Sequence, residues 1–139
     1  MVDMAHFEEE AESPRVLVAE GSIERGERLA TALERSGYRT TVVTRGDVAY
    51  EVVRRVPLDL YVLEVDLPGL GALEILRLAR RQVGFRPAII TCRMATKDLF
   101  IEALGARAFA MLSEPVDPRL LTRAVDRAIE KFLRGGFRG

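Results

Sequence analysis

Short apolar runs alternate along this chain with segments in which apolar residues recur at helical spacing. The apolar runs cover residues 15–19, 39–43, 58–63, 87–91 and 108–112. Each run is rich in aliphatic or β-branched residues and short enough for a strand, whereas the segments between them have the period of amphipathic helices. This alternation favours a parallel sheet, because parallel neighbours need a crossover long enough to hold a helix.

Residues that begin and end helices stand at the expected junctions. Ser22 is placed to cap the first helix and Gly37 to end it. Pro57 stops the second helix, since proline disfavours helical backbone in the residue before it. Asp117 precedes Pro118, which pairs an N-cap residue with a proline in the first turn of the last helix.

Five strand–helix units predict one α/β domain in residues 15–134. Right-handed crossovers arrange such units as a flavodoxin-like (βα)5 three-layer sandwich, with a parallel sheet of strand order 2-1-3-4-5. Residues 1–14 carry acidic side chains and no Lys or Arg, which is typical of a disordered tail. We expect residues 135–139 to form a short flexible tail.

Composition excludes several classes of protein. The 21 basic and 21 acidic side chains cancel, so no global field favours nucleic acid or an anionic membrane as a partner. Cys92 is the only cysteine, which excludes an internal disulfide and a zinc site built from several cysteines. The chain shows no signal peptide and no apolar stretch near the roughly 18 residues that span a bilayer, so we expect a cytoplasmic protein.

Polar residues gather where the predicted strands end. In open parallel sheets, functional sites form at the carboxyl edge, near the switch point between the first and third strands. The residues just after the first, third, fourth and fifth strands are Glu20 and Gly21, Glu64 and Asp66, Cys92 and Arg93, and Glu114 and Pro115. The sequence therefore predicts a pocket with an excess of carboxylates.

Three segments give the chain a resemblance to the receiver domains of bacterial response regulators. Residues 15–20 read RVLVAE, residues 59–69 read DLYVLEVDLPG, and residues 113–118 read SEPVDP. The resemblance extends from residue 15 to about residue 133. It implies a signalling module of the two-component, or phosphorelay, type and not an enzyme.

The resemblance also assigns roles to positions. In that family an acidic pair after the first strand helps to bind Mg²⁺, and an aspartate after the third strand accepts a phosphoryl group. A Thr or Ser after the fourth strand and a Lys after the fifth contact the phosphoryl oxygens. Matched by position, Glu20 retains the first acid, Gly21 takes the place of the second, and Glu64 stands at the phosphoacceptor position. Cys92 replaces the hydroxyl residue, and Glu114 replaces the Lys.

Other positions follow the same pattern. Asp66 and Pro68 fit the loop after the acceptor, and Met111 replaces the usual aromatic switch residue. Pro115 keeps the proline that follows the Lys in the family, usually after a cis peptide bond.

Three of these replacements oppose phosphoryl transfer. Glu64 adds a methylene group that moves the carboxylate by roughly 1 Å, and such errors cost on the order of a hundredfold in rate. Gly21 removes a carboxylate from the Mg²⁺ that neutralises the transferring group. Glu114 puts negative charge where the developing anion needs a cation. We therefore expect no catalytic residues and no efficient phosphorylation.

The surplus carboxylates need a counter-charge, and three arrangements stay open. Arg93 can turn inward and pair with Glu64 or Glu114. A divalent cation such as Mg²⁺ can bind weakly among Glu20, Glu64 and Asp66, although no other cofactor is expected. Alternatively, Arg93 and Glu114 simply face solvent.

A surface around the fifth strand is the candidate partner face. Phe109 and Met111 lie in this edge strand, and Arg119, Arg123 and Arg127 share a face of the last helix. An apolar edge strand invites a partner unless a helix covers it. We expect a signalling kinase, an output protein or a second copy of the chain to bind there, through the fourth helix, fifth strand and fifth helix. Alternatively, Phe109 packs under the fourth helix.

The favoured interpretation is a phosphorylation-independent pseudo-receiver that acts by protein–protein contact. In it, Glu64 partly mimics a phosphorylated aspartate, and a separate partner supplies the output because no output domain follows residue 134. The alternative is a working phosphorelay receiver that is phosphorylated on a non-standard carboxylate such as Asp66. A flavin-binding protein is disfavoured, because Glu20 and Glu24 surround the helix start that would hold phosphate.

Overall fold

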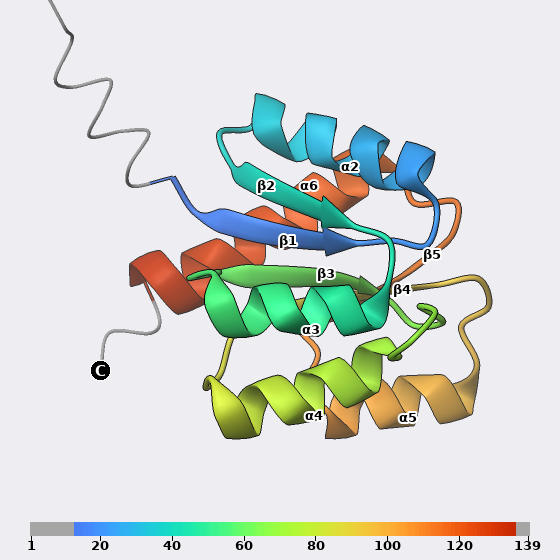
Figure 1. Ribbon diagram of the computed structural model, residues 1–139. Coiled ribbons are helices and arrows are strands. Elements are labelled where there is room, and N and C mark those ends of the chain that lie inside the picture. Colours follow the sequence, from blue (N-terminus) through green and yellow to red (C-terminus); the bar gives the residue numbers. More distant parts are fainter. Residues whose placement is uncertain (1–12, 136–139) are drawn as a thin grey trace, which may run out of the picture.

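The computed structural model describes residues 13–135 as a five-stranded parallel sheet with helices on both faces (Figure 1). The strands are β1 (Arg15–Ala19), β2 (Arg39–Val43), β3 (Leu60–Glu64), β4 (Ala88–Cys92) and β5 (Ala110–Ser113). Their order is 2-1-3-4-5 and all neighbours are parallel, so the predicted flavodoxin-like topology is confirmed. The expectations for residues 1–12 and 136–139 lie outside the described residues.

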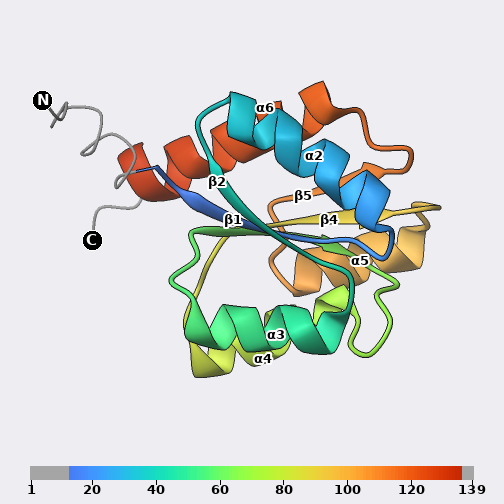
Figure 2. The same ribbon diagram turned by 45° about the horizontal axis from the view of Figure 1, so that its top comes forward.

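Helices form the two outer layers. They are α2 (Ile23–Arg35), α3 (Gly46–Arg55), α4 (Ala72–Gln82), α5 (Lys97–Gly105) and α6 (Pro118–Ile129), and α6 continues into the π-helical segment η1 (Glu130–Gly135). Helices α2 and α6 cover one face of the sheet, whereas α3, α4 and α5 cover the other (Figure 2). Within residues 13–135, no helix has the length and apolar character needed to cross a bilayer.

The expected helix caps are present. The Ser22 hydroxyl accepts a hydrogen bond from the backbone N–H of Arg25, and the Asp117 carboxylate accepts one from the N–H of Arg119. Gly37 follows α2 with a φ of 97°, a left-handed backbone that glycine adopts without a steric penalty. These caps orient α2 and α6 so that both helices begin at the carboxyl edge of the sheet.

Side chains that alternate along the strands build two separate cores. On β1, Val16 and Val18 pack toward α2 and α6, whereas Leu17 and Ala19 pack toward α3 and α4. β3 and β4 alternate in the same way, and all five residues of each are buried. The central strands are therefore enclosed on both faces, as expected for a parallel sheet.

Two strands begin two residues later than the sequence predicts, and β4 begins one residue later, at Ala88. β3 begins at Leu60, and the preceding Asp59 bonds Arg15 of β1, with its carboxylate accepting the N–H of Arg15 at 2.8 Å. β5 begins at Ala110, because the N–H of Ala108 still bonds the end of α5, at 2.9 Å from the Ala103 carbonyl oxygen. These shifts leave the carboxyl ends of the strands close to their predicted positions.

Candidate functional site

Three glutamates meet at the carboxyl edge of the sheet. Glu20 follows β1, Glu64 ends β3 and Glu114 follows β5. Each offers a carboxylate oxygen, and these oxygens lie within 4.8 Å of one another. Glu20 is 3% exposed and Glu64 is 6% exposed, whereas Glu114 is partly exposed. The predicted acidic pocket is therefore present, and it is largely shielded from water.

Strand alternation explains why these glutamates converge. Val18 and Val62 belong to the core under α2 and α6, and Glu20 and Glu64 lie two residues further along the same strands. Because side chains two apart share a face, both carboxylates point to the α2 and α6 side of the sheet. Glu114 follows Leu112 of the same core in the same way.

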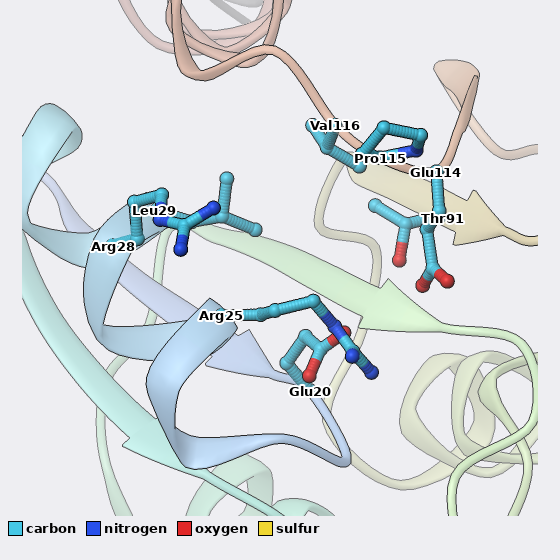
Figure 3. Close-up of a pocket in the computed structure, with 8 residues that line it drawn as sticks. All are labelled: Glu20, Arg25, Arg28, Leu29, Thr91, Glu114, Pro115 and Val116. Carbon is cyan, nitrogen blue, oxygen red and sulfur yellow. The ribbon is translucent and has the colours of Figure 1, made fainter.

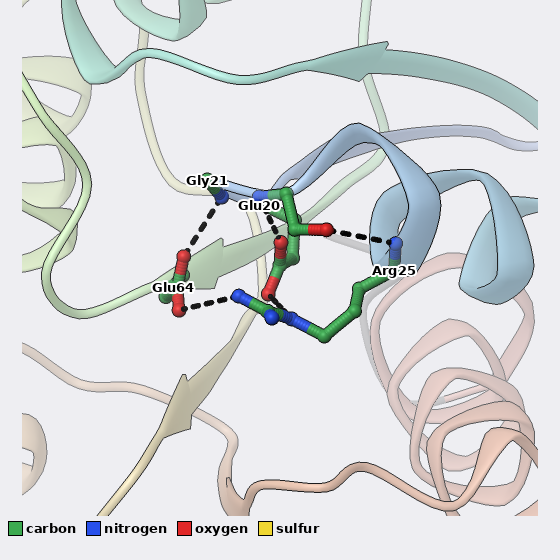
Figure 4. A network of polar contacts seen from close by, with 5 residues as sticks. Glu20, Gly21, Arg25 and Glu64 are labelled. Atoms are coloured by element: carbon green, nitrogen blue, oxygen red, sulfur yellow. Dashed lines mark hydrogen bonds and ion pairs between the residues drawn. The ribbon is translucent and has the colours of Figure 1, made fainter.

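The two buried carboxylates are held by N–H donors from the start of α2 (Figure 4). Glu20 accepts the N–H of Ser22 at 2.5 Å on Oε2 and Nε of Arg25 at 2.8 Å on Oε1. Glu64 accepts the N–H of Gly21 at 2.8 Å on Oε1, while its Oε2 lies 3.9 Å from Nη2 of Arg25. Each of the four oxygens therefore faces a donor.

Arg25, which none of the three arrangements left open by the sequence included, supplies the counter-charge. Arg93 is exposed and takes part in none of the ion pairs found within residues 13–135, so it faces solvent and does not turn inward, whereas Glu114 is partly buried. The hydrogen bond and charge of Glu20 raise the pKa of Arg25, and Glu114 and Glu64 add to this effect. A basic residue in the first turn of a helix opposes the helix dipole, and this is the sequence signal that points to Arg25.

Glu114 is the least compensated carboxylate of the cluster. Burial raises the pKa of Glu114 to about 7, with the adjacent Glu64 carboxyl and the charge of Glu20 acting in the same direction and Arg25 opposing them. Its Oε1 is buried and has no hydrogen-bond partner in the described part of the chain. The folded chain therefore favours the protonated form of this group more than the unfolded chain does.

A small cavity opens beside the cluster. It has a volume of about 40 Å³ and is lined by Glu20, Arg25, Arg28, Leu29, Thr91, Glu114, Pro115 and Val116. Figure 3 shows Arg25 and Glu20 on one side and Glu114, Thr91 and Pro115 on the other. The space admits a few water molecules, whereas pockets for drug-sized ligands have on the order of 300–1,000 Å³. The cavity thus gives no support to flavin binding.

Cys92 is a buried thiol, 1% exposed, with its Sγ 3.8 Å from the carbonyl oxygen of Leu112. Burial raises its pKa, and the charges of Glu114 and Asp66 act in the same direction. The adjacent Thr91 is also buried and lines the cavity. Thr91, and not Cys92, is thus the residue of β4 that lines the cavity, and alternation along the strand, which puts Thr91 on the same face as Ile89, is a sequence signal for it.

Asp66, Gly21 and Pro115 complete the set of residues that were predicted to lie at this edge of the sheet. Asp66 is exposed and lies outside the cluster, so the oxygen set that the structure brings together contains Glu114 in place of Asp66. Gly21 lies so close to Glu64 that an added Cβ would be 3.1 Å from Oε1. The peptide bond between Glu114 and Pro115 is cis, as the resemblance implies.

A divalent cation is poorly matched to these residues as they stand. Mg²⁺ and Ca²⁺ prefer oxygen ligands, and Glu20, Glu64 and Glu114 could each offer one. However, the four oxygens of Glu20 and Glu64 already face N–H donors, and Gly21 brings no carboxylate. Arg25 would have to leave before a cation could be chelated between Glu20 and Glu64.

The predicted partner face is only partly exposed to solvent. Phe109 is half-buried and packs in the core under α2 and α6, where its ring meets Phe132 edge-on at 6.0 Å between centroids. Met111 is half-buried on the opposite face of the sheet. The three arginines of α6, Arg119, Arg123 and Arg127, are exposed, as expected.

Helix α5 exposes three large apolar side chains to solvent, which was not predicted from its sequence. Phe100, Ile101 and Leu104 are 51%, 55% and 58% exposed. A cavity of about 60 Å³ lies between this helix and β5, and Phe100, Leu104, Phe109 and Met111 are among its lining residues. The apolar side chains near β5 therefore form one continuous surface with α5.

Comparison with known proteins gives a consistent result. Residues 16–126 match the response regulator receiver domain family. The transcriptional regulatory protein BaeR of Escherichia coli is 27% identical over 119 residues, which cover 86% of this chain and 49% of that protein. The DNA-binding response regulator MtrA of Mycobacterium tuberculosis is 28% identical over 111 residues, covering 80% of this chain and 48% of that protein. The chain thus spans about half the length of these curated relatives.

Solved structures share the fold. A CheY-like response regulator receiver domain protein from Methanospirillum hungatei superposes with a TM-score of 0.81 at 19% identity, covering 86% of this chain and 96% of that chain. The receiver domain of the Francisella response regulator 1452 superposes with a TM-score of 0.80 at 25% identity, covering 86% and 98%.

Proposed function

This chain belongs to the family of response regulator receiver domains, and we propose that it is a phosphorylation-independent member that signals by binding another protein. The observation that carries the proposal is the charge arrangement at the carboxyl edge. Three carboxylates share one arginine there, and within residues 13–135 none of the three forms an ion pair with a lysine. A phosphoryl group would add further negative charge to this cluster.

The geometry opposes two requirements of acyl-phosphate formation, a free acceptor carboxylate and a nearby cation. The Glu64 carboxylate is engaged by the N–H of Gly21 and the guanidinium of Arg25, so it is not free to attack. Glu114 stands where a cation is needed to stabilise the developing charge. The buried Thr91 still offers a hydroxyl beside the cluster, so the opposition comes from Glu64 and Glu114.

The same contacts favour one fixed state of the domain. Glu64 is 6% exposed and bound to the start of α2, and Glu20 is bound to two donors from the same segment. Hydrogen bonds to buried polar groups restrict the local structure. Glu64 therefore keeps a carboxyl group fixed at the acceptor position, and no phosphorylation step is needed to introduce it.

We place the partner surface on α5, β5 and α6. Phe100 and Leu104 form its exposed apolar part, Phe109 and Met111 line the small cavity next to them, and Arg119, Arg123 and Arg127 form the basic part. Exposed apolar side chains next to charged ones are typical of protein interfaces. A protein in the cytoplasm fits this surface better than nucleic acid, because the net charge of the chain is zero.

Acetyl phosphate with Mg²⁺, followed by intact mass measurement, tests the proposal. We expect no covalent gain, while an ordinary receiver domain in the same tube gains one phosphoryl group. A phosphoryl gain on this chain would overturn the proposal and support a working phosphorelay receiver. Peptide mapping would then show whether Glu64 or Asp66 is the acceptor.

Substitution of Phe100 tests the proposed partner surface independently of the phosphorylation experiment. We expect Phe100→Ser to weaken self-association or capture of a partner, because this side chain is half exposed and contributes to the exposed apolar part. Val48→Ser is the matched control, since Val48 is 46% exposed on α3, on another part of the surface. Equal binding by both variants would reject this surface.

A further inference from the structure

We propose that Arg25 is an internal counter-ion that occupies the place of the divalent cation and keeps metal out of the acidic cluster. This inference rests on the proposed function, since a domain without phosphoryl chemistry has no need of the metal. It goes further by naming the residue that blocks the site and what its removal would restore.

The position of the guanidinium supports this role. Nε of Arg25 lies 2.8 Å from Oε1 of Glu20, and Nη2 lies 3.9 Å from Oε2 of Glu64 (Figure 4). A chelated Mg²⁺ would need both carboxylates within about 2.1 Å. The guanidinium already bridges the same two groups, so arginine and metal cannot share the space.

Backbone N–H groups also help to keep a metal ion away from Glu20 and Glu64. The N–H groups of Gly21 and Ser22 take one oxygen of Glu64 and one of Glu20. These donors come from the turn that enters α2, where the helix dipole adds partial positive charge. With one oxygen of each carboxylate bound to backbone and the other facing Arg25, the buried pair has no oxygen free of a donor.

Arginine suits this position better than a bound ion does. Its guanidinium stays charged at any pH that the protein tolerates, and its planar fork matches carboxylate geometry. The Arg25 side chain is 45% exposed, so it reaches the cluster from the rim without being buried itself. It therefore neutralises part of the cluster permanently, whatever the concentration of free metal.

Arg25→Gln is the decisive variant, and Arg28→Gln is its matched control. Arg28 lies one turn further along α2, has the same charge and lines the same cavity, but it takes part in none of the ion pairs within residues 13–135. Mg²⁺ and Mn²⁺ are titrated into the full chain at constant ionic strength and followed by calorimetry. Removing a unit charge this close to the carboxylates should strengthen metal binding by at least about tenfold.

The expected result is at least tenfold tighter Mn²⁺ and Mg²⁺ binding to Arg25→Gln than to the wild type, with Arg28→Gln unchanged. Equal affinities for the two variants would overturn the inference. Should Arg25→Gln fail to fold alone, recovery of its circular dichroism spectrum by Mg²⁺, but not by Na⁺ of equal ionic strength, supports the inference, and no recovery overturns it.

Failure of this inference is distinguishable from failure of the proposed function. If the wild type gains a phosphoryl group in the mass experiment, the proposed function fails whatever Arg25 does. If the wild type gains none and Arg25→Gln binds metal no better than Arg28→Gln, only the role of Arg25 is wrong.

Discussion

Replacing Glu114 by Gln should change how the stability of the domain depends on pH. Burial and the neighbouring glutamates raise the pKa of Glu114 from its ordinary value of 4.5 to about 7. The folded chain therefore holds this proton more tightly than the unfolded chain does. The stabilisation that results is complete below about pH 4.5 and is lost as the pH rises through about 7.

The size of the effect follows from the two pKa values. A rise from 4.5 to about 7 corresponds to about 3 kcal/mol if it is realised in full. Because Glu114 is partly exposed, solvent screening reduces this contribution. We therefore expect the free energy of unfolding to fall by about 1–3 kcal/mol between about pH 5 and pH 8 on account of this group.

Urea unfolding followed by far-ultraviolet circular dichroism measures the change, since the chain has no tryptophan to report by fluorescence. Glu114→Gln resembles the protonated side chain at every pH. We expect it to match the wild type near pH 5 and to be more stable by about 1–3 kcal/mol near pH 8. Glu74→Gln, an exposed position on α4, is the control and should follow the wild type throughout.

All other titratable groups are the same in the wild type and in Glu114→Gln, so their contributions to the pH dependence of stability cancel when the two proteins are compared. If the wild type and Glu114→Gln lose stability in parallel from about pH 5 to pH 8, Glu114 holds no extra proton in the folded state. The picture of an under-compensated acidic cluster would then be wrong.

Two further outcomes follow from the packing of the same edge. Gly21→Asp should destabilise the domain by about 1–3 kcal/mol, because it adds a fourth carboxylate and a Cβ 3.1 Å from Oε1 of Glu64. The double variant with Glu64→Asp should recover most of this loss in urea unfolding, since the shorter side chain makes room, and equal stabilities of the single and double variants would refute this coupling. Cys92 should resist alkylation by iodoacetamide in the folded protein and react only after unfolding, because it is 1% exposed and burial raises its pKa. Rapid labelling of the native chain would contradict that assignment.

Much of the fold could be predicted from the sequence because strand runs and helix caps are local signals. The same pattern brings Glu20, Glu64 and Glu114 to one edge, since the carboxyl ends of parallel strands meet there. The period of two along each strand even specifies that all three point to the α2 and α6 side. The strand order and the place of the acidic cluster thus follow from the pattern, although the pattern also put Asp66, which is exposed, into the cluster.

The identity of the counter-ion could not be predicted in this way. Arg25 reaches the cluster through a long side chain from a helix, and strand alternation carries no information about where such a side chain points. Arg93 follows a strand directly, and its inward turn was one of the three arrangements left open, yet it is exposed. Likewise, the contact of Phe109 with Phe132 depends on η1, which extends the chain past α6 in a conformation that a helical pattern does not reveal.

The response of backbone amides to Mg²⁺ with beryllofluoride, a phosphoryl mimic, tests the central claim most directly. In isotope-labelled wild-type protein, the N–H of Gly21 bonds Glu64, and the N–H of Glu114 bonds the Cys92 carbonyl oxygen at 2.7 Å, so both report on the pocket. We expect their signals to stay in place as the two reagents are added together. Saturable shifts of both amides would show that the pocket accepts metal and phosphoryl group, and would contradict a receiver that works without phosphorylation.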